Sequence, residues 1–369
     1  MPRRLDGEGT WRLRPDGRYE FRLRIDGQRR SFFGTTQTEA RDKMRAAQRL
    51  VEENKPVPSD RLSTAAYLTE WLAGQRGKLA PESIRRYEGR IARLLPYIGK
   101  VKLSRLQGVD IERALVAIGA EVSPTTVQLI HGVIHKALSD AEKLGKVSRN
   151  VAKLTSPPRR NTREYRSLRP DDAKALLAAA KGDPLEAFYA MAVTTGLRLG
   201  ELQALQWGDV DMVRGRVTVR RTLAVDGKPI FTASSTTKNH NRTVALAAFV
   251  VEALEQHRER QGEQCRAARD AWTDHGLVFT TGTGNPLDGR NLRGRQFLKL
   301  LAKAGLPHMR IHDLRHSAAS LLLAERVPIK VVSEMLGHAD VTTTLRIYAH
   351  VIEGDQQQAT AYMDRLFHG

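Results

Sequence analysis

The sequence of 369 residues contains one cysteine, Cys265. A single cysteine excludes an intramolecular disulfide and every zinc site that needs several thiolates. Long apolar stretches are also missing, because the longest, Val244 to Val251, is far too short to span a bilayer. The N-terminal Met1 to Leu5 lacks the apolar segment of a signal peptide. We therefore expect a cytoplasmic protein without a membrane partner.

Negative charge is scarce, since 60 Lys and Arg stand against 41 Asp and Glu. The formal net charge is +19 and the isoelectric point is near 10.3. Such an excess indicates a polyanionic partner, and nucleic acid fits best because Lys and Arg neutralise phosphates. An anionic membrane surface is the competing interpretation, but no long basic amphipathic helix stands out. The length allows two or three domains.

The first 55 residues form a predicted small domain. Tyr19 to Ile25 alternates apolar and charged side chains, which is the period of a half-buried strand. Asp26-Gly27 is a hairpin signal, so Gln28 to Phe33 is the predicted return strand, and Trp11 to Arg14 supplies a first strand. A helix follows the capping box Thr36-x-x-Glu39. Its predicted buried residues are Ala40, Met44, Ala47 and Val51.

A basic face is predicted on this small sheet. One interpretation is that the face lies in a DNA groove, and the other is that its arginines are merely solvated. The arginines concerned are Arg12, Arg14, Arg22, Arg24 and Arg30.

Helical periodicity dominates residues 60–155, after a linker rich in proline. Pro81-Glu82, Asp110 and Ser123-Pro124 are start signals of successive helices, the last of which should end near Leu144-Gly145. The helix that starts at Pro81 carries arginines off its apolar stripe, which suits phosphate contacts although such faces are usually only solvated. These are Arg85, Arg86, Arg90 and Arg93.

A polar, basic hinge at Ser156 to Arg163 precedes the last predicted domain, residues 164–369. Arg216 to Leu223, Ile230 to Thr232 and Arg242 to Leu246 predict one small antiparallel sheet among helices. Val225-Asp226-Gly227 is the expected turn of a hairpin. The predicted class is therefore α+β and mainly helical.

The stretch from Ile311 to His350 carries most of the candidate chemistry. His312 and Arg315 are three residues apart, so on a helix they share one face. A planar guanidinium beside an imidazole suits a phosphate, because one side chain anchors the anion and the other carries a proton.

The rest of that stretch brings further groups towards the same point. A helix from Pro328 should end at Gly337, which leaves His338 in the following turn. Thr342 is the expected N-cap of a last helix that carries Tyr348. Each element alone is weak evidence, since an HxxR pair is usually a solvated helix face and a lone tyrosine is usually core.

A second arginine motif lies far upstream, where Arg198 follows Gly196 in the segment from Thr194 to Leu202. With this ordered set, the chain resembles the tyrosine recombinases of the phage integrase family. The resemblance covers roughly Leu62 to His350 and is strongest in the last domain. Its motif residues are Arg198, His312, Arg315, His338 and Tyr348.

The resemblance implies that Tyr348 attacks a scissile DNA phosphate and forms a 3′-phosphotyrosyl enzyme with a free 5′-hydroxyl. Arg198 and Arg315 would bind the non-bridging oxygens and stabilise the charge of the transition state. The covalent bond retains the energy of the phosphodiester, so the reaction would need no metal, ATP or other cofactor.

By the same resemblance, His312 takes part in proton transfer at the tyrosine and His338 donates a hydrogen bond to the phosphate. Glu201, three residues after Arg198, is expected to orient the site and not to bind a metal.

The general acid for the 5′-oxygen is expected to be a lysine on a hairpin turn, in a stretch resembling Lys-Thr-x-x-x-x-Arg. In this chain Thr236 occupies the strictly aligned position and Lys238 lies two residues later, so Lys238 is the candidate. Lys228, in the other turn, is the alternative.

The family resemblance also implies the partners. Residues 1–55 are similar to arm-type DNA-binding domains and residues 60–155 to the helical core-binding domain. Double-stranded DNA with core and arm sites, a homo-tetramer on that DNA, and a DNA-bending protein or excision factor are the expected partners, at the nucleoid of a bacterial host. The expected function is integration or excision of a phage or mobile element. The rival functions are a catalytically silent DNA-binding relative and a type IB topoisomerase.

Overall fold

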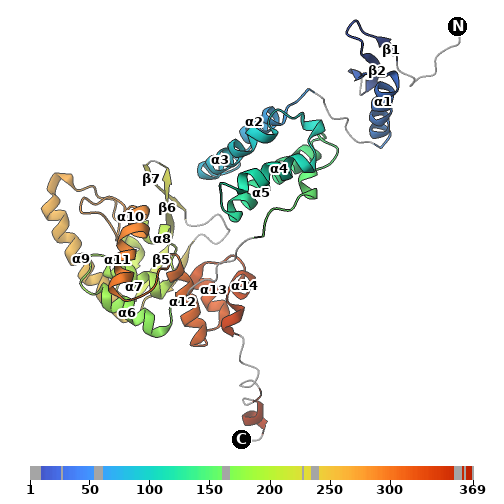
Figure 1. Ribbon diagram of the computed structural model, residues 1–369. Coiled ribbons are helices and arrows are strands. Elements are labelled where there is room, and N and C mark those ends of the chain that lie inside the picture. The colour runs from blue at the N-terminus through green and yellow to red at the C-terminus, as the bar shows by residue number, and fades with distance from the viewer. Residues whose placement is uncertain are drawn as a thin grey trace. The chain divides into compact units, whose positions relative to one another are not determined.

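The computed structural model describes residues 10–25, 28–53, 61–159, 167–226, 228–233, 241–352, 360 and 363–367. The chain divides into two compact units, residues 1–162 and 163–369. The first unit holds two separate apolar clusters, one beside the N-terminal sheet and one in a helical bundle. Helices predominate in Figure 1, and strands occur at the N-terminus and in the second unit. The predicted mainly helical α+β class is confirmed.

The N-terminal sheet is antiparallel in the order β1 (Thr10–Leu13), β2 (Tyr19–Ile25) and β3 (Gln28–Gly34), followed by α1 (Gln37–Glu52). The predicted strands are confirmed, while the Asp26-Gly27 turn lies outside the described residues. Glu39 donates its backbone N–H to the Thr36 hydroxyl, but its carboxylate binds Thr35, so half of the capping box forms. The helix buries Ala40, Met44 and Ala47, whereas Val51 is exposed, contrary to prediction.

The polar face of this sheet differs in one residue from the prediction. Arg22 lies opposite Ser31, and Arg24 lies opposite Arg29. Arg30 lies opposite Leu23 and therefore belongs to the other face, since side chains alternate along a strand. Its assignment to the basic face was wrong, because the register places Arg29 there instead.

The buried carboxylate of Glu20 organises that polar face. It accepts hydrogen bonds from Arg12 at 2.6 Å, Arg22 at 3.0 Å and the Ser31 hydroxyl at 2.7 Å. The Arg22 hydrogen bond, with those of Ser31 and Arg12, lowers the pKa of Glu20 although burial opposes this shift. Arg14 lies over the Phe33 ring at 5.4 Å. Four of the five predicted arginines thus lie at or beside this face.

The helical part of the first unit begins as predicted. Pro81 is the first residue of its helix, and Ser123 caps the helix that starts at Pro124. The intervening helix starts at Gly108, because Asp110 caps it from the third position through the Gln107 N–H. The elements are α2 (Thr64–Ala73), α3 (Pro81–Ile98), α4 (Gly108–Gly119) and α5 (Pro124–Lys143), with 3-10 turns at Leu103–Arg105 and Val151–Leu154.

The predicted arginines of α3 lie on its surface. Arg85 and Arg86 both pair with Glu82, at 2.6 and 3.1 Å. Arg90 is half-buried and Arg93 is exposed. The opposite stripe of α3 enters the apolar cluster through Ile84, Ile91, Leu94 and Ile98.

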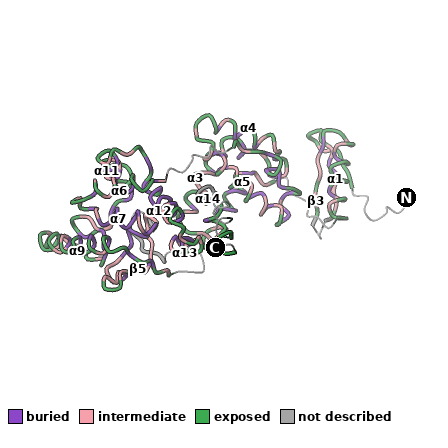
Figure 2. The backbone as a smooth tube through the Cα atoms, turned by 90° about the horizontal axis from the view of Figure 1, so that it is seen from below, coloured by how far each residue is buried: buried purple, intermediate pink, exposed green. Residues whose placement is uncertain are grey.

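The second unit surrounds α7 (Glu186–Thr195), which Figure 2 shows as buried along most of its length. Its other helices are α6 (Pro170–Ala180), α8 (Leu199–Gln203), α9 (Ala248–Ala268), α10 (Gly289–Asn291), α11 (Phe297–Lys303), α12 (Asp313–Ala324), α13 (Ile329–Leu336) and α14 (Val341–Ile352). Short 3-10 turns cover Trp207–Asp209 and Arg269–Ala271, and a π-helical turn covers Leu292–Gln296.

The strands of this unit form two sheets where one was predicted. β4 (Val210–Asp211), β5 (Arg216–Val219) and β8 (Arg242–Ala245) pair in one, and β6 (Arg221–Asp226) pairs with β7 (Lys228–Ala233) in the other. The predicted strand from Arg216 to Leu223 is interrupted at Arg220. Asp226 pairs with Lys228, and Gly227 of the predicted turn lies outside the described residues.

The last three helices pack against one another around Leu323, Val332, Leu336 and Tyr348 (Figure 1). Gly337 ends α13 with φ of +66°, a backbone conformation that glycine adopts without strain. The last helix starts at Val341 and not after Thr342, because the Asp340 carboxylate accepts the Thr342 N–H at 2.8 Å.

Candidate active site

The first arginine motif lies at a sharp break between α7 and α8. Gly196 has φ of +62°, and a Cβ there would lie 2.7 Å from Leu336 Cδ2, so only glycine fits. The chain then turns into α8 with Arg198 at its N-cap. The Arg198 side chain is 40% exposed and reaches the carbonyl oxygen of Gly337 at 3.4 Å. This contact brings the arginine next to the turn that carries His338.

The carboxylate of Glu201 holds Arg198 in place through hydrogen bonds. It accepts the Arg198 backbone N–H at 2.9 Å and Nη1 at 3.0 Å. Arg242, on β8, adds two further hydrogen bonds at 3.1 and 2.6 Å. Burial by itself would raise the pKa of Glu201, but the hydrogen bonds and charges of Arg242 and Arg198 outweigh it and lower the pKa to about 2. Glu201 is thus a buried carboxylate that stays charged.

Arg315, on α12, is only 5% exposed. Its Nη1 donates to the carbonyl oxygen of Gly196 and its Nη2 to that of Leu336, both at 2.6 Å. These bonds fix the plane of the guanidinium, and two of its five N–H groups are used in them. Burial and the nearby charge of Arg198 lower the pKa of Arg315 to about 9, which leaves it positive at neutral pH.

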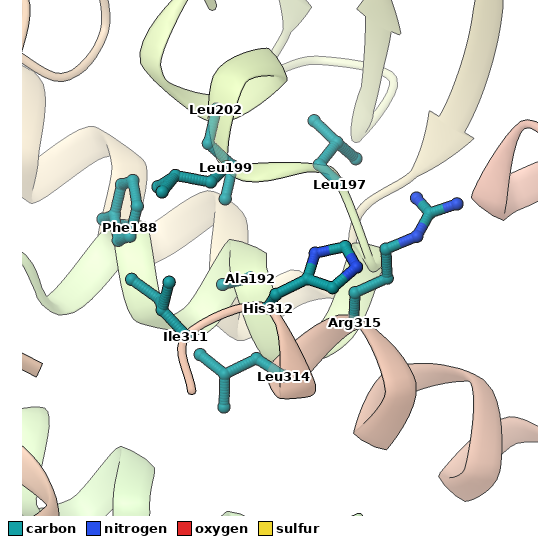
Figure 3. A pocket seen from close by; sticks show the side chains of 9 residues that line it. All are labelled: Phe188, Ala192, Leu197, Leu199, Leu202, Ile311, His312, Leu314 and Arg315. Carbon is teal, nitrogen blue, oxygen red and sulfur yellow. The ribbon is translucent and has the colours of Figure 1, made fainter. Parts of the chain in front are cut away.

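His312 is the N-cap residue of α12. In Figure 3 its ring lies between the apolar side chains of Leu199 and Ile311 and the guanidinium of Arg315. Desolvation, followed by the positive charge of Arg315, lowers the pKa of His312. The imidazole is therefore neutral at physiological pH and able to accept a proton.

His338 follows the left-handed Gly337 in the turn between α13 and α14, as predicted. Its Nδ1 lies 2.8 Å from the hydroxyl of the fully buried Thr344. Desolvation, then the charges of Arg315 and Arg198, lower the pKa of His338 to about 4. Thr344 thereby orients a neutral imidazole.

Tyr348 lies on α14 and is only 2% exposed. Its hydroxyl lies 2.8 Å from Nδ1 of His316, a buried histidine one helical turn after His312. The two rings have centroids 5.9 Å apart. The tyrosine is thus docked against α12 of its own chain.

These side chains line one pocket of about 310 Å³. Three guanidinium groups, neutral imidazoles and a phenol converge there, a set that suits an anionic phosphate and attack by an oxygen nucleophile. All five predicted motif residues meet in it. The lining consists of Arg198, Arg310, His312, Arg315, His316, His338, Ile347 and Tyr348.

Other predicted residues lie elsewhere. Lys238 is outside the described residues, and the alternative Lys228 is described only by its backbone, paired with Asp226. Glu201 does not line the pocket but holds Arg198. The predicted DNA-binding arginines of residues 12–90 all belong to the first unit.

Three residues of the site were not assigned from the sequence: Arg242, Arg310 and His316. Arg242 ends the lysine stretch, four residues after Lys238, which was its only signal. His316 lies four residues after His312, a helical spacing that places both on one side of α12. Arg310 pairs with Asp313 at 2.7 Å and precedes the HxxR motif by two residues.

Among the described residues, no group of three or more His, Cys, Asp or Glu side chains could hold a metal ion. None of the helices in the described part of the chain has both the length and the hydrophobicity to cross a lipid bilayer.

Comparison with known proteins agrees with this geometry. Residues 166–354 match the phage integrase family, and residues 65–116 match the N-terminal SAM-like domain of phage integrases. An integrase of Streptomyces ambofaciens is 32% identical over 344 residues, which are 90% of this chain and 88% of that protein. A XerC-like tyrosine recombinase of Caldanaerobacter subterraneus subsp. tengcongensis is 27% identical over 92% of both chains.

Solved structures share the fold. The Tn1549 transposon integrase in complex with a circular intermediate DNA matches with a TM-score of 0.69 at 18% identity, over 83% of this chain and 99% of that one. A lambda integrase dimer bound to a COC′ core site matches with a TM-score of 0.60 at 17% identity, over 94% and 96%.

The chain therefore belongs to the phage integrase family. It is a site-specific tyrosine recombinase, an enzyme that cleaves and rejoins DNA.

Proposed function

We propose that Tyr348 attacks a scissile DNA phosphate and forms a 3′-phosphotyrosyl intermediate with a free 5′-hydroxyl. The observation that supports this role is the shared pocket, in which the tyrosine, Arg198 and Arg315 line one cavity. A second strand's 5′-hydroxyl then reverses the step, so the strands are exchanged without hydrolysis. A nicked suicide substrate, which traps the adduct, tests the proposal directly.

In this mechanism the two arginines act as a phosphate clamp. Arg315 is held rigidly by two carbonyl oxygens, and Arg198 by Glu201. Fixed cationic donors stabilise the charge that grows on the non-bridging oxygens without reorganising during the reaction. The buried ion pair with Arg242 fixes the position of Glu201, which in turn holds Arg198.

The neutral imidazoles take the remaining polar roles. His312, next to the clamp, takes part in proton transfer at the tyrosine side. When the Thr344 hydroxyl donates to Nδ1 of His338, the proton of that ring is on Nε2, which then donates to the phosphate. Lys238 is the proposed general acid for the 5′-oxygen, with Lys228 as the alternative.

We also propose that the chain has three functional parts. Residues 1–55 bind arm-type DNA, residues 60–155 bind core DNA, and residues 164–369 catalyse. The separate apolar clusters of the first unit support this division. The proposed arm-binding residues are Arg12, Arg14, Arg22 and Arg24, and those of the core-binding part are Arg85, Arg86 and Arg90.

The natural substrate is proposed to be the attachment DNA of a phage or other mobile element. Structures of lambda integrase include a dimer bound to a core site and a tetramer bound to a Holliday junction. We infer that this chain likewise binds double-stranded DNA and recombines it as a tetramer, with a DNA-bending protein or excision factor as a further partner. Strand exchange between two attachment sites distinguishes this function from DNA binding alone and from relaxation by a topoisomerase.

A further inference from the structure

His312, at the N-cap of α12, and His316, within that helix, line the pocket of Tyr348 at different depths. His312 is exposed at the phosphate pocket, whereas His316, one turn further along α12, is only 8% exposed. The two rings meet edge to face, with centroids 5.4 Å apart and planes at 87°. Nδ1 of His316, the deeper of the two rings, lies 2.8 Å from the Tyr348 hydroxyl.

The chemistry of both groups favours one direction for this hydrogen bond. A phenol is protonated at neutral pH, and when it donates its O–H to Nδ1 of His316, the ring proton is on Nε2. Burial, then the charges of His312, Arg315 and Arg310, lower the pKa of His316 to about 4, against the opposing effect of Asp313. The ring therefore stays neutral and keeps its acceptor across the physiological range.

We propose that His316 is the positioning residue of the nucleophile: its Nδ1 holds the Tyr348 hydroxyl at the wall of the phosphate pocket. This inference rests on the proposed role of Tyr348 in DNA cleavage. The bond fixes the one rotatable group of a phenol that is otherwise held by packing among Leu323, Leu336 and their neighbours. Fixing the attacking oxygen near the bound phosphate reduces the entropy lost on reaching the transition state.

His316 does not serve as the final proton acceptor in this scheme. An ordinary tyrosine has a pKa of about 10, so transfer to a ring of pKa about 4 would be uphill by roughly six pKa units. The one phenolic proton must therefore leave its bond to His316 during attack, and His312, which lines the same pocket, is the proposed group that receives it. His316 orients the oxygen before attack, and His312 takes the proton during attack.

The first test compares variants at position 316 in the full-length protein. His316→Asn places a carbonyl oxygen close to the position of Nδ1, whereas His316→Phe keeps the ring volume without an acceptor. We expect His316→Phe to slow covalent adduct formation on saturating suicide DNA by about 10- to 100-fold with DNA affinity little changed. His316→Asn should recover most of the rate, and His308→Phe, which changes an exposed histidine, should match the wild type.

Equal slowing by the Asn and Phe variants, or a faster rate with Phe, would overturn the proposal. A purely structural role predicts the first outcome, and a latch that restrains the tyrosine predicts the second. An adduct that persists in Tyr348→Phe would instead overturn the assignment of the nucleophile, and so the two failures are distinguishable.

A second measurement does not depend on how the variants at position 316 fold. Nitrogen-15 NMR of the histidines should report an unprotonated Nδ1 and a protonated Nε2 for His316. The Nδ1 resonance should move in Tyr348→Phe, because the hydrogen-bond donor is removed. A protonated Nδ1 in the wild type, or an unchanged resonance in that variant, would overturn the proposal.

Discussion

Glu201 and Arg242 form a two-bonded ion pair, at 3.1 and 2.6 Å, although 41 residues separate them in the sequence. The side chain of Glu201 is 1% exposed and that of Arg242 is 15% exposed. Nε of the same guanidinium donates to the carbonyl oxygen of Met335 at 2.8 Å. One arginine thus joins β8, α8 and the end of α13, the three segments that meet behind the phosphate pocket.

Breaking this pair should destabilise the second unit. Removing one partner of a buried ion pair leaves the other charge uncompensated, and so Glu201→Gln should cost about 3–5 kcal/mol of unfolding free energy. Thermal or urea unfolding of the variant checks this value. Glu255→Gln, which changes an exposed carboxylate on α9, is the matched control and should unfold like the wild type.

The same carboxylate predicts an acid dependence. The pKa of Glu201 is lowered from 4.5 to about 2 in the folded protein. Its contribution to stability is therefore present above pH 4.5 and is lost as the pH falls towards 2, by about 3 kcal/mol in all. Unfolding free energies measured between pH 6 and 3 should fall less steeply for Glu201→Gln than for the wild type. Parallel slopes would contradict the shift.

Replacing the nucleophile should separate binding from cleavage. Tyr348→Phe should form no covalent adduct on suicide DNA and bind the core site with near wild-type affinity. The loss of its hydrogen bond to His316 should cost about 1 kcal/mol of stability. Tyr97→Phe, at an exposed tyrosine on α3, is the control. An adduct that maps to Tyr362 would refute the assignment.

The phosphate clamp should not tolerate lysine. Arg198→Lys and Arg315→Lys keep the charge but lose the planar fork, so cleavage should fall by about 10²- to 10³-fold. Only Arg315→Lys should also lower the unfolding temperature, because Arg315 binds the carbonyl oxygens of Gly196 and Leu336 in the buried interior. Single-turnover cleavage and thermal scans check both effects, with Arg293→Lys as an exposed control. Normal cleavage by either variant would exclude that residue from the transition state.

The leaving-group acid can be identified with a modified substrate. Lys238→Ala should cleave ordinary DNA slowly but cleave a 5′-bridging phosphorothiolate at a nearly normal rate, since the sulfur departs without protonation. Lys228→Ala should cleave both substrates like the wild type. The opposite pattern in the two variants would transfer the role to Lys228.

The N-terminal sheet can be tested by truncation. A fragment of residues 60–369 should bind and cleave the core site but fail to recombine full attachment sites. Footprints of the intact protein should include bases that the fragment leaves unprotected. Binding of the intact protein should also depend more strongly on salt than binding of the fragment. Identical footprints would show that the sheet does not bind arm DNA.

Local features of the fold were predictable from the sequence. Alternation gave the strand Tyr19–Ile25, and Pro81, Ser123 and Gly337 correctly predicted helix ends, since propensity and capping depend on residues a few positions apart. The predicted motif residues were also brought together in one pocket. The predicted N-cap Thr342 was wrong by two positions, because Asp340 accepts the Thr342 N–H and hydroxyl and so caps the helix earlier.

The tertiary structure alone decided which side chains meet across long stretches of chain. The face on which Arg30 lies depends on strand register, the division into two sheets depends on a break at Arg220, and the exposure of Val51 depends on where the core ends. Periodicity likewise cannot reveal that Arg242 binds Glu201 or that His316, and not His312, binds the Tyr348 hydroxyl. Sequence spacing sets the direction of a side chain within one element, whereas its partner is chosen by the packing of separate elements against one another.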